Sequence, residues 1–499
     1  MTGDLTIGRW IDDRADLTPD RIAIDFGGSA VTYRQVAERS DALAAEFVGR
    51  GLQRGDRVAV LSENRPEYVD VLFACAKAGL IMVPLNWRLT PPEIAFQLDD
   101  GEVALLLVDD GLQGSAADAL GLSSVNPEVR DLRVPAAPAP VPHRDIDDAD
   151  PLFLIYTSGT TGKPKGALIT HANTFWTNLA IDRIMDVTTF DVVLQVLPQF
   201  HIGGWNVQPL LAWWKGATVV LEPAFDPERA LELIGSKRVT TMMGVPATYL
   251  FMAESPRFGD ADLTSLRSAV VGGAPMPEPL IERWHRRGVQ LIQGYGLTEA
   301  SPNVLGLPAE DVARKIGYAG KPYPHVAVGL ADTETGAIIE GEGIGELIVK
   351  GPSVFPGYWR NSKATAETLV DGWLHTGDVA ERDAEGFYRI RDRVKDMYIS
   401  GGENVYPAEV ESVLAQHPAV VEAAVLGVPH ERWGEVGRAV VVVRAGHELT
   451  GEEVVEWCRE RVASYKIPRD VIFVDALPRS AMNKILKREL VGSVEGARR

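Results

Sequence analysis

The stretch SLRSAVVGGAPMPEPLIERWHRRGVQLIQGYG, residues 265–296, alternates two kinds of segment. An apolar run ends in paired glycines, a segment with helical spacing follows, and a second apolar run ends in Gly-Tyr-Gly. This order predicts a strand, a glycine-rich turn, a helix and a second strand. Strands joined through a helix run parallel, and helices then cover both faces of their sheet. The stretch therefore predicts an α/β fold that binds its ligand at the carboxyl ends of the strands.

The same alternation recurs along most of the chain. Residues 55–63 and 81–86 are expected to form strands on either side of a helix over 66–80. Beyond residue 390 the chain becomes rich in charge, aromatic residues and glycine, and then continues as an α+β module of about a hundred residues. We therefore predict a large N-terminal domain of parallel-rich sheets, residues 1–393, and a small mobile C-terminal α+β domain, residues 394–499, joined within DRVKD (392–396).

Composition excludes several classes of protein. The formal charge of −19 over 499 residues argues against nucleic acid or an anionic membrane as the main partner. The two cysteines, Cys75 and Cys458, lie in amphipathic patterns without a metal-ligand spacing, which favours buried side chains in a reducing compartment. No signal peptide and no 18-residue apolar run are seen, so we expect a cytoplasmic protein without a membrane anchor. The sequence leaves the oligomeric state open, a homodimer included.

The segment YTSGTTGKPKG, residues 156–166, combines hydroxyl groups, glycines and two lysines. It is not a Walker A loop, because only two residues separate Gly159 from Gly162 and because Pro164 follows Lys163. Glycines still allow backbone amides to turn inward and form a nest for an anion. Taken alone, the segment is equally explained as a Ser/Thr/Gly surface loop.

Together with other motifs, this segment resembles the signature of the adenylate-forming superfamily, and its acyl-CoA synthetase branch in particular. The further motifs occur in the family's order: LPQFHIGG (197–204), VVGGAPMP (270–277), GYGLTE (294–299), GWLHTGD (372–378), YRIRDRVKD (388–396), SGGENVYPAEVE (400–411) and LPRSAMNKILK (477–487). The resemblance spans nearly the whole chain.

The resemblance implies a two-step reaction that uses Mg²⁺, ATP and coenzyme A. A carboxylic acid, expected to be a fatty or other apolar acid, would first form an acyl-adenylate and pyrophosphate. The thiol of coenzyme A would then form the thioester and release AMP. Two alternatives remain: an adenylating ligase that passes the acyl group to an amine or a carrier-protein thiol, and a nucleotide-binding relative without catalysis.

For the nucleotide, the resemblance implies a set of binding residues: Thr157, Ser158, Gly159, Thr160, Thr161, Gly162, Lys163, Gly273, Ala274, Tyr295, Gly296, Asp378 and Arg393. An aromatic face such as Tyr295 suits adenine, and a lone carboxylate such as Asp378 suits two ribose hydroxyls. Core packing is the alternative for Tyr295, a surface ion pair for Arg393, and a plain turn for Gly273 taken singly.

For catalysis, the resemblance implies Lys484, Thr298, Glu299 and His201, with Glu299 as the magnesium ligand. A lysine from the small domain neutralises charge that develops at the α-phosphate. The chain reads SAMNK where the family commonly has N-P-T-G-K, so Asn483 replaces a glycine, although Asn tolerates a positive φ. A packed core side chain is the alternative for His201.

The remaining predicted roles concern motion and the acid. The resemblance implies a hinge at Lys395 and a passage for coenzyme A beside Gly401 and Gly402. Residues expected to line the acyl pocket are Gly204, Trp205, Tyr249 and Val304. The segment LPQFHIGGWN has no Asp to pair with an ammonium group, so we expect an acid without a free α-amine.

Overall fold

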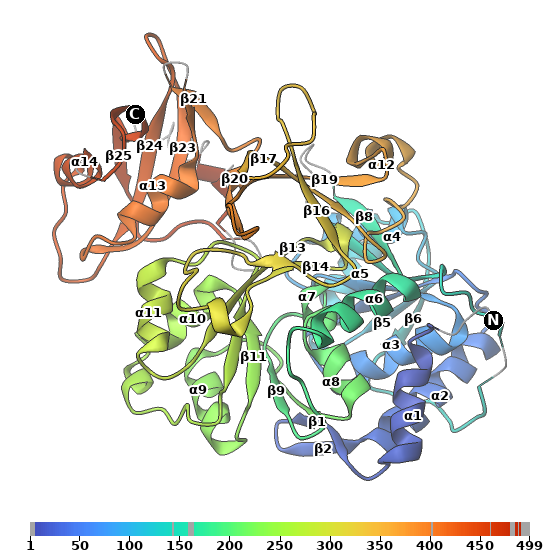
Figure 1. The fold of residues 1–499 in the computed structure, drawn as a ribbon. Coiled ribbons are helices and arrows are strands. Elements are labelled where there is room, and N and C mark those ends of the chain that lie inside the picture. The colour runs from blue at the N-terminus through green and yellow to red at the C-terminus, as the bar shows by residue number, and fades with distance from the viewer. Residues whose placement is uncertain are drawn as a thin grey trace.

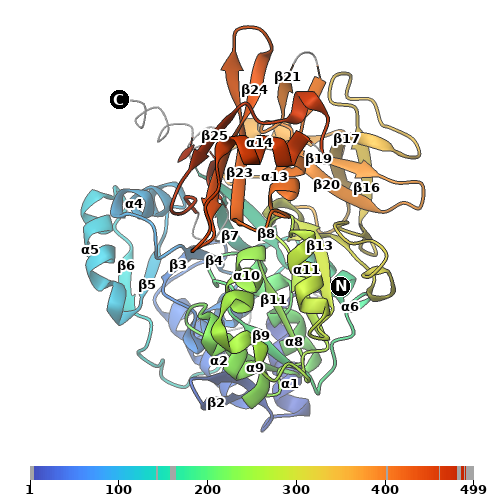
Figure 2. The ribbon, with the colours of Figure 1, turned by 90° about the vertical axis from the view of Figure 1, so that its left-hand side faces the viewer.

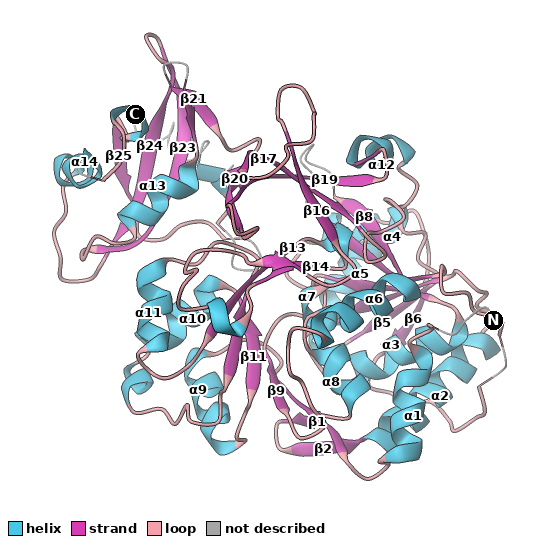
Figure 3. Cartoon of the chain, in the orientation of Figure 1, coloured by secondary structure: helices cyan, strands magenta, loops and turns pink. Residues whose placement is uncertain are grey.

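The computed structural model describes residues 5–141, 144–157, 164–400, 403–459, 461–479, 485–487 and 489–490. Within them the strands form four sheets, of which two are large and mostly parallel (Figure 3). The nine-stranded sheet consists, in spatial order, of β15 (Lys321–Pro322), β14 (Asn303–Gly306), β13 (Leu291–Gly296), β12 (Ser268–Val271), β11 (Thr241–Gly244), β9 (Val192–Gln195), β10 (Thr218–Leu221), β1 (Ile22–Phe26) and β2 (Ser29–Thr32).

The second large sheet has six described strands: β6 (Glu128–Asp131), β5 (Leu105–Val108), β3 (Arg57–Leu61), β4 (Ile81–Leu85), β7 (Pro151–Thr157) and β8 (Lys165–Thr170). One continuous hydrophobic core joins both sheets through the helices α3 (Pro66–Ala78) and α8 (Pro209–Lys215). The helix α3 contacts β4 of the six-stranded sheet, and α8 contacts β9 and β10 of the nine-stranded sheet. Side chains of β3 and β4 belong to this core and also to the cluster on the other face of their sheet, which explains why both strands are apolar runs rather than alternating patterns.

The other helices cover the outer faces and edges. Three of them pack on the nine-stranded sheet: α9 (Pro227–Ser236), α10 (Pro246–Glu254) and α11 (Glu278–His285). Two pack on the six-stranded sheet: α4 (Pro91–Asp100) and α5 (Gln113–Leu122). The remaining helices of the large part are α1 (Gly8–Leu17), α2 (Tyr33–Gly49), α6 (His171–Asp182), α7 (Gly203–Asn206) and α12 (Ser362–Thr368).

Two smaller sheets complete the described chain. The first contains β16 (Ala327–Ala331), β17 (Gly343–Lys350), β18 (Leu369–Val370), β19 (Trp373–Arg382) and β20 (Tyr388–Arg393). The second contains β21 (Tyr398–Ser400), β22 (Glu403–Val405), β23 (Val420–His430), β24 (Gly434–Val443) and β25 (Asp470–Phe473), with α13 (Pro407–Leu414) and α14 (Gly451–Arg459). This module, orange to red in Figures 1 and 2, lies above both large sheets.

The predicted α/β architecture is confirmed, including the order strand, turn, helix, strand over residues 268–296. The helix α11 begins with Glu278 and ends with Arg283 and His285, which favours its dipole. The division after Arg393 stays a prediction; β20 pairs with β19, whereas β21 pairs with β22 and β24. Among the described residues, no helix combines the length and apolar character that crossing a membrane requires.

Acid is expected to destabilise the fold through His171, at the start of α6. Its Nδ1 accepts a hydrogen bond from the amide of Ile7 at 3.3 Å, and burial lowers its pKa to about 4. An unfolded histidine titrates near 6.5, so the unfolded chain binds the extra proton between about pH 4 and 6.5, and stability falls as the pH falls through this window. Lowering the pH from about 7.5 to about 5 should remove about 2 kcal/mol.

The measurement is urea unfolding of the wild type and of His171→Gln at both pH values. The variant cannot take up this proton, so its free energy of unfolding should fall by about 2 kcal/mol less than that of the wild type. An identical pH dependence in both proteins would show that another group controls acid stability.

Candidate active site

The carboxyl ends of β12 and β13 bring together two of the predicted motifs. The strands are parallel, with Val271 paired to Gln293, so Gly273 and Tyr295 follow at the same edge of the sheet. Gly273 has a φ of 84°, a conformation that side chains disfavour. A Cβ on Gly296 would lie 1.8 Å from the carbonyl oxygen of Pro302, so only glycine fits there. At this edge the backbone of Gly296 packs directly against the backbone of Pro302. The neighbouring residue Tyr295 is half-buried.

Asp378 lies at the centre of a three-residue contact that spans two sheets. The hydroxyl of Tyr295 donates to one of its carboxylate oxygens, and Nε of Arg393 lies 2.8 Å from the other. Asp378 and Arg393 are register partners in β19 and β20. Burial and the carboxylate raise the pKa of Tyr295, and the same carboxylate raises the pKa of Arg393. Each carboxylate oxygen accepts more than one hydrogen bond, so Asp378 retains capacity for hydroxyl donors.

The turn before Asp378 is held by a residue that the sequence did not reveal. Gly377 has a φ of 70°, and its amide donates to Oε1 of Glu346 at 2.9 Å. The other oxygen of Glu346 lies 2.8 Å from Nδ1 of His375. Glu346 belongs to β17, where it looks like an ordinary polar strand residue. It positions the turn through its hydrogen bond to the backbone of Gly377.

Glu299 has a partner from a distant loop. The hydroxyl of Tyr358 donates to Oε1 of Glu299 at 2.7 Å, and the amide of Phe355 donates to the Glu299 carbonyl at 2.9 Å. Nζ of Lys165, at the start of β8, lies 5.0 Å from the centroid of the Tyr358 ring. Tyr358 therefore joins the motif at 294–299 to the end of the segment at 156–166. Sequence analysis missed it, although the aromatic run FPGYW (355–359) was a visible signal.

The two ends of the glycine-rich segment lie next to each other. Thr157 ends β7 and pairs with Lys165 in the antiparallel strand β8. The hydroxyl of Thr157 lies 3.5 Å from the carbonyl oxygen of Lys165. The predicted phosphate ligands between them fall outside the described residues: Ser158, Gly159, Thr160, Thr161, Gly162 and Lys163. Lys165, at the described end of this segment, thus lies beside Tyr358, the partner of Glu299.

Glu299 is the carboxylate that fits a magnesium ion at this edge. The described residues contain no group of three or more His, Cys, Asp or Glu that holds a metal by itself. Magnesium typically takes one or two carboxylates and completes its coordination with substrate phosphates and water. One carboxylate near the segment that is predicted to bind phosphate suits an ion that arrives with the nucleotide.

The residues expected to line the acyl pocket are deeply packed. The indole N–H of Trp205 donates to the carbonyl of Gln199 at 2.6 Å, and the hydroxyl of Tyr249 donates to the carbonyl of Val270 at 2.7 Å. Val304 is fully buried. A Cβ on Gly204 would lie 2.4 Å from the carbonyl oxygen of Pro198, so this glycine serves close packing. Their role as walls of an acid pocket stays a prediction.

The other residues predicted to act near the reacting groups are only partly placed. His201 follows β9 and is half-buried, with its ring centroid 4.7 Å from that of Phe200. Thr298 is half-buried at the end of β13, and Ala274 follows Gly273 as an exposed residue. Lys484 lies outside the described residues, and its neighbour Ile485 forms a β-bridge with Arg479.

The linker between β20 and β21 exposes Lys395, the predicted hinge. Gly401 and Gly402 lie outside the described residues, between the strands β21 and β22. Their described neighbours belong to a pocket of about 150 Å³, which is lined by Ser400, Glu403, Trp433, Val436, Ser464, Tyr465, Ile467 and Arg469. It offers two aromatic rings and a cation.

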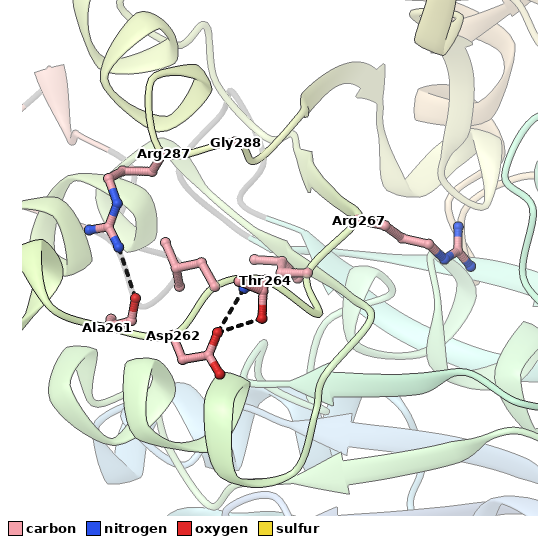
Figure 4. Close-up of a pocket in the computed structure, with 8 residues that line it drawn as sticks. Ala261, Asp262, Thr264, Arg267, Arg287 and Gly288 are labelled. Carbon is pink, nitrogen blue, oxygen red and sulfur yellow. Dashed lines mark hydrogen bonds between the residues drawn. The ribbon is translucent and has the colours of Figure 1, made fainter.

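A larger depression of about 420 Å³ lies at the opposite, amino-terminal edge of the strands (Figure 4). Of its lining residues, Arg267 directly precedes β12 and Gly288 lies shortly before β13. Its polar groups bond to one another: Arg287 donates to the carbonyl of Ala261, and Thr264 donates to Asp262 (Figure 4). The depression is therefore remote from Tyr295 and Asp378 and contributes nothing to this site.

Comparison with known proteins agrees with this geometry. Residues 11–359 match the family model described as AMP-binding enzyme, and residues 409–484 match the model of the AMP-binding enzyme C-terminal domain. A feruloyl-CoA synthase of an Amycolatopsis species is 44% identical over 490 residues, which cover 97% of this chain and 98% of the relative. An indoleacetate–CoA ligase of Aromatoleum aromaticum is 38% identical over 498 residues, with coverage of 97% and 98%.

Solved structures are similar over the whole chain. The crystal structure of ATP-bound MatB from Rhodopseudomonas palustris superposes with a TM-score of 0.91 at 33% identity and covers 100% of both chains. The o-succinylbenzoate CoA synthetase MenE of Bacillus subtilis, in complex with its acyl-adenylate intermediate, gives a TM-score of 0.86 at 34% identity and covers 97% of both chains. The chain therefore belongs to the AMP-binding enzyme family, in its branch of acid–CoA ligases.

Proposed function

We propose that the protein activates an aryl carboxylic acid with ATP and transfers the acyl group to coenzyme A. Its family and relatives make it an AMP-forming acid–CoA ligase. The aryl part of the proposal is supported by similarity to ligases named for feruloyl, indoleacetate and 2-succinylbenzoate groups, each of which is aromatic. This favours an aryl acid among the fatty or other apolar acids that the sequence led us to expect.

The contact of Tyr295, Asp378 and Arg393 beside Glu299 is the observation that carries the mechanism. In the proposed arrangement the Tyr295 ring stacks on adenine, and Asp378 accepts hydrogen bonds from the ribose hydroxyls with Arg393 beside it. Gly273, Ala274 and Gly296 leave room for the base. Glu299 would hold a Mg²⁺ ion, which would neutralise part of the negative charge of the phosphates.

In the first step a carboxylate oxygen of the acid attacks the α-phosphorus, and the bond to pyrophosphate breaks. The phosphates would be held by Lys163 and by the hydroxyl groups of Thr157, Ser158, Thr160, Thr161 and Thr298. Lys484 would stabilise the negative charge that develops during the transfer. In the second step the thiol of coenzyme A loses its proton and attacks the acyl carbon, and AMP leaves. His201 would border the carboxylate at the acid's end of the site.

The two steps require different parts of the small domain over one site, which is the proposed role of the Lys395 hinge. Coenzyme A would pass beside Gly401 and Gly402. The neighbouring pocket, with Trp433, Tyr465 and Arg469, offers aromatic faces for a base and a cation for phosphate.

The test is pyrophosphate release from Mg·ATP with ferulate, indoleacetate, 2-succinylbenzoate and saturated fatty acids, each with and without coenzyme A. We expect kcat/KM to be at least about tenfold higher for one or more aryl acids than for any fatty acid, with a thioester formed when coenzyme A is present. Faster turnover of a fatty acid would overturn the aryl proposal. Adenylate without thioester would favour an amine or a carrier-protein thiol as the acceptor.

A further inference from the structure

Tyr358 contacts two oppositely charged side chains that come from distant parts of the chain. Its hydroxyl donates to Oε1 of Glu299 at 2.7 Å, and Nζ of Lys165 lies over its ring, 5.0 Å from the centroid. All three residues are half-buried, so none of them is sealed in the core. One tyrosine therefore contacts an anion at its hydroxyl and a cation at its face.

The segment that carries Tyr358 is fixed against β8. The amide of Trp359 donates to the carbonyl of Gly166 at 2.7 Å, and the amide of Tyr358 donates to Oγ1 of Thr365 at 3.0 Å. Gly357 has a φ of 147°, and a Cβ there would lie 2.6 Å from Cγ2 of Thr365. Only glycine therefore fits before Tyr358, and the backbone at this position is fixed by its neighbours.

The same segment is also bonded to the turn that carries Glu299. Glu299 lies in the short helix Thr298–Ala300, and its carbonyl accepts a hydrogen bond from the amide of Phe355 at 2.9 Å. The ring of Phe355 packs edge-on against that of Tyr358, with 4.9 Å between the centroids. Contacts on both sides thus set the position of the tyrosine ring relative to β8 and to Glu299.

Lys165 and Glu299 carry opposite charges and attract each other across a half-buried site. A direct ion pair between them would use both charges and leave less of each for a ligand. Tyr358 offers each of them a separate, uncharged partner: its hydroxyl for the carboxylate and its ring face for the ammonium. A hydrogen bond at Oε1 also orients the carboxylate, as the partners of metal-binding carboxylates commonly do.

We propose that Tyr358 is a positioning residue that keeps Lys165 and Glu299 from pairing with each other. It would hold the Glu299 carboxylate ready for the metal ion of Mg·ATP and the Lys165 ammonium ready for the phosphates. The inference rests on the proposed function, which assigns Glu299 to the magnesium ion, and it adds Lys165 to the cations around the phosphates. Tyr358 acts through these two neighbours and not on the reacting atoms.

The first test is equilibrium binding of ATP, without any acid, to the wild type and to Tyr358→Phe. The phenylalanine keeps the ring face and loses the hydroxyl, so Glu299 loses its donor. We expect the affinity for Mg·ATP to fall by about tenfold and the affinity for ATP in excess EDTA to change by about twofold or less. Equal affinity of both proteins for Mg·ATP would overturn the inference.

A double-mutant cycle shows whether Tyr358 acts through Glu299. Glu299→Gln removes the charge that the hydroxyl is proposed to orient, so Tyr358→Phe should then cost about twofold or less in affinity for Mg·ATP. Full, additive losses from the two substitutions would overturn the positioning role.

Tyr358→Leu tests the second contact, because it removes the ring and the hydroxyl together. The affinity for metal-free ATP should fall by about two- to fivefold, since Lys165 loses the ring face that holds it and can then pair with Glu299. Unchanged affinity for metal-free ATP would overturn the part of the inference that concerns Lys165.

The matched control is Tyr33→Phe, which removes a hydroxyl that donates to the carbonyl of Ala217 at 2.6 Å. Tyr33 directly follows the edge strand β2, at the opposite end of the nine-stranded sheet from β14, and the variant should bind Mg·ATP as the wild type does. An equal loss of Mg·ATP affinity in this control would overturn the inference, because the assay would then report stability alone. Failure of the proposed function is distinct: the wild type would release no pyrophosphate with any acid, while the binding comparison would still be read.

Discussion

Replacement of Lys484 by alanine is expected to reduce acid-dependent pyrophosphate release by about 100- to 1,000-fold. The proposed lysine ammonium stabilises charge that appears only in the transition state, so its loss should lower kcat far more than it raises the KM for ATP. The measurement is steady-state pyrophosphate release under saturating ATP and acid, together with ATP affinity from equilibrium binding, which should change by about threefold or less.

The two half-reactions separate this role from a general defect. If Lys484 acts in adenylation alone, Lys484→Ala should still convert a supplied acyl-adenylate and coenzyme A to the thioester at a near-normal rate. The control is Lys363→Ala, which removes a lysine whose side chain is 87% exposed on α12. Normal pyrophosphate release by Lys484→Ala would refute the assignment, and loss of both half-reactions with a lower melting temperature would indicate a structural role.

The sequence predicted the fold best where the pattern is local. The strands β3, β4 and β12 are buried between layers, so each is a continuous apolar run that ends at glycine or a polar residue. The motifs at 270–277 and 294–299 were predictable as neighbours, because parallel strands end at the same edge. Local periodicity and one topological rule were enough for this part.

Contacts between distant segments could not be predicted in the same way. Glu346 reaches Gly377 across 31 positions, and Tyr358 reaches Glu299 across 59. Glu346 belongs to a strand and Tyr358 to a loop. The sequence pattern around each is just as consistent with a side chain exposed to solvent as with one that makes a buried contact. For Trp205 and Tyr249 the prediction went beyond what their contacts show. Their positions in or near family motifs suggested that they line a pocket, whereas their polar atoms bond to backbone carbonyls in the core.

The polar face of α6 shows a third difficulty. Thr174, Thr177 and Asn178 have the spacing of one helix face, and such a polar stripe normally indicates solvent exposure. Only the structure shows that α6 is covered on this face by α7 and β14. The sequence therefore predicts that the stripe exists, and packing decides whether it faces water or the protein interior.

Replacement of Asp378 by asparagine is expected to lower kcat/KM for ATP by about 10- to 100-fold, mainly through the KM for ATP. The carboxylate is proposed to accept hydrogen bonds from two ribose hydroxyls, and bonds to a charged acceptor are worth about 1.5–3 kcal/mol each. The amide has one oxygen instead of two, and its NH₂ group would face the guanidinium of Arg393. Affinity for the acid should not change, which distinguishes lost nucleotide binding from a disturbed fold.

The decisive comparison uses ATP and ATP analogues without the 2′ or the 3′ hydroxyl. The wild type should discriminate against each analogue by about tenfold or more, whereas Asp378→Asn should treat all three nucleotides nearly alike, because the group that senses the hydroxyls is gone. Asp332→Asn is the matched control, since that carboxylate bonds within an exposed turn beside β16. If Asp378→Asn still discriminates, the ribose is recognised elsewhere, and the role of Asp378 is then to hold Tyr295 and Arg393 together across the two sheets.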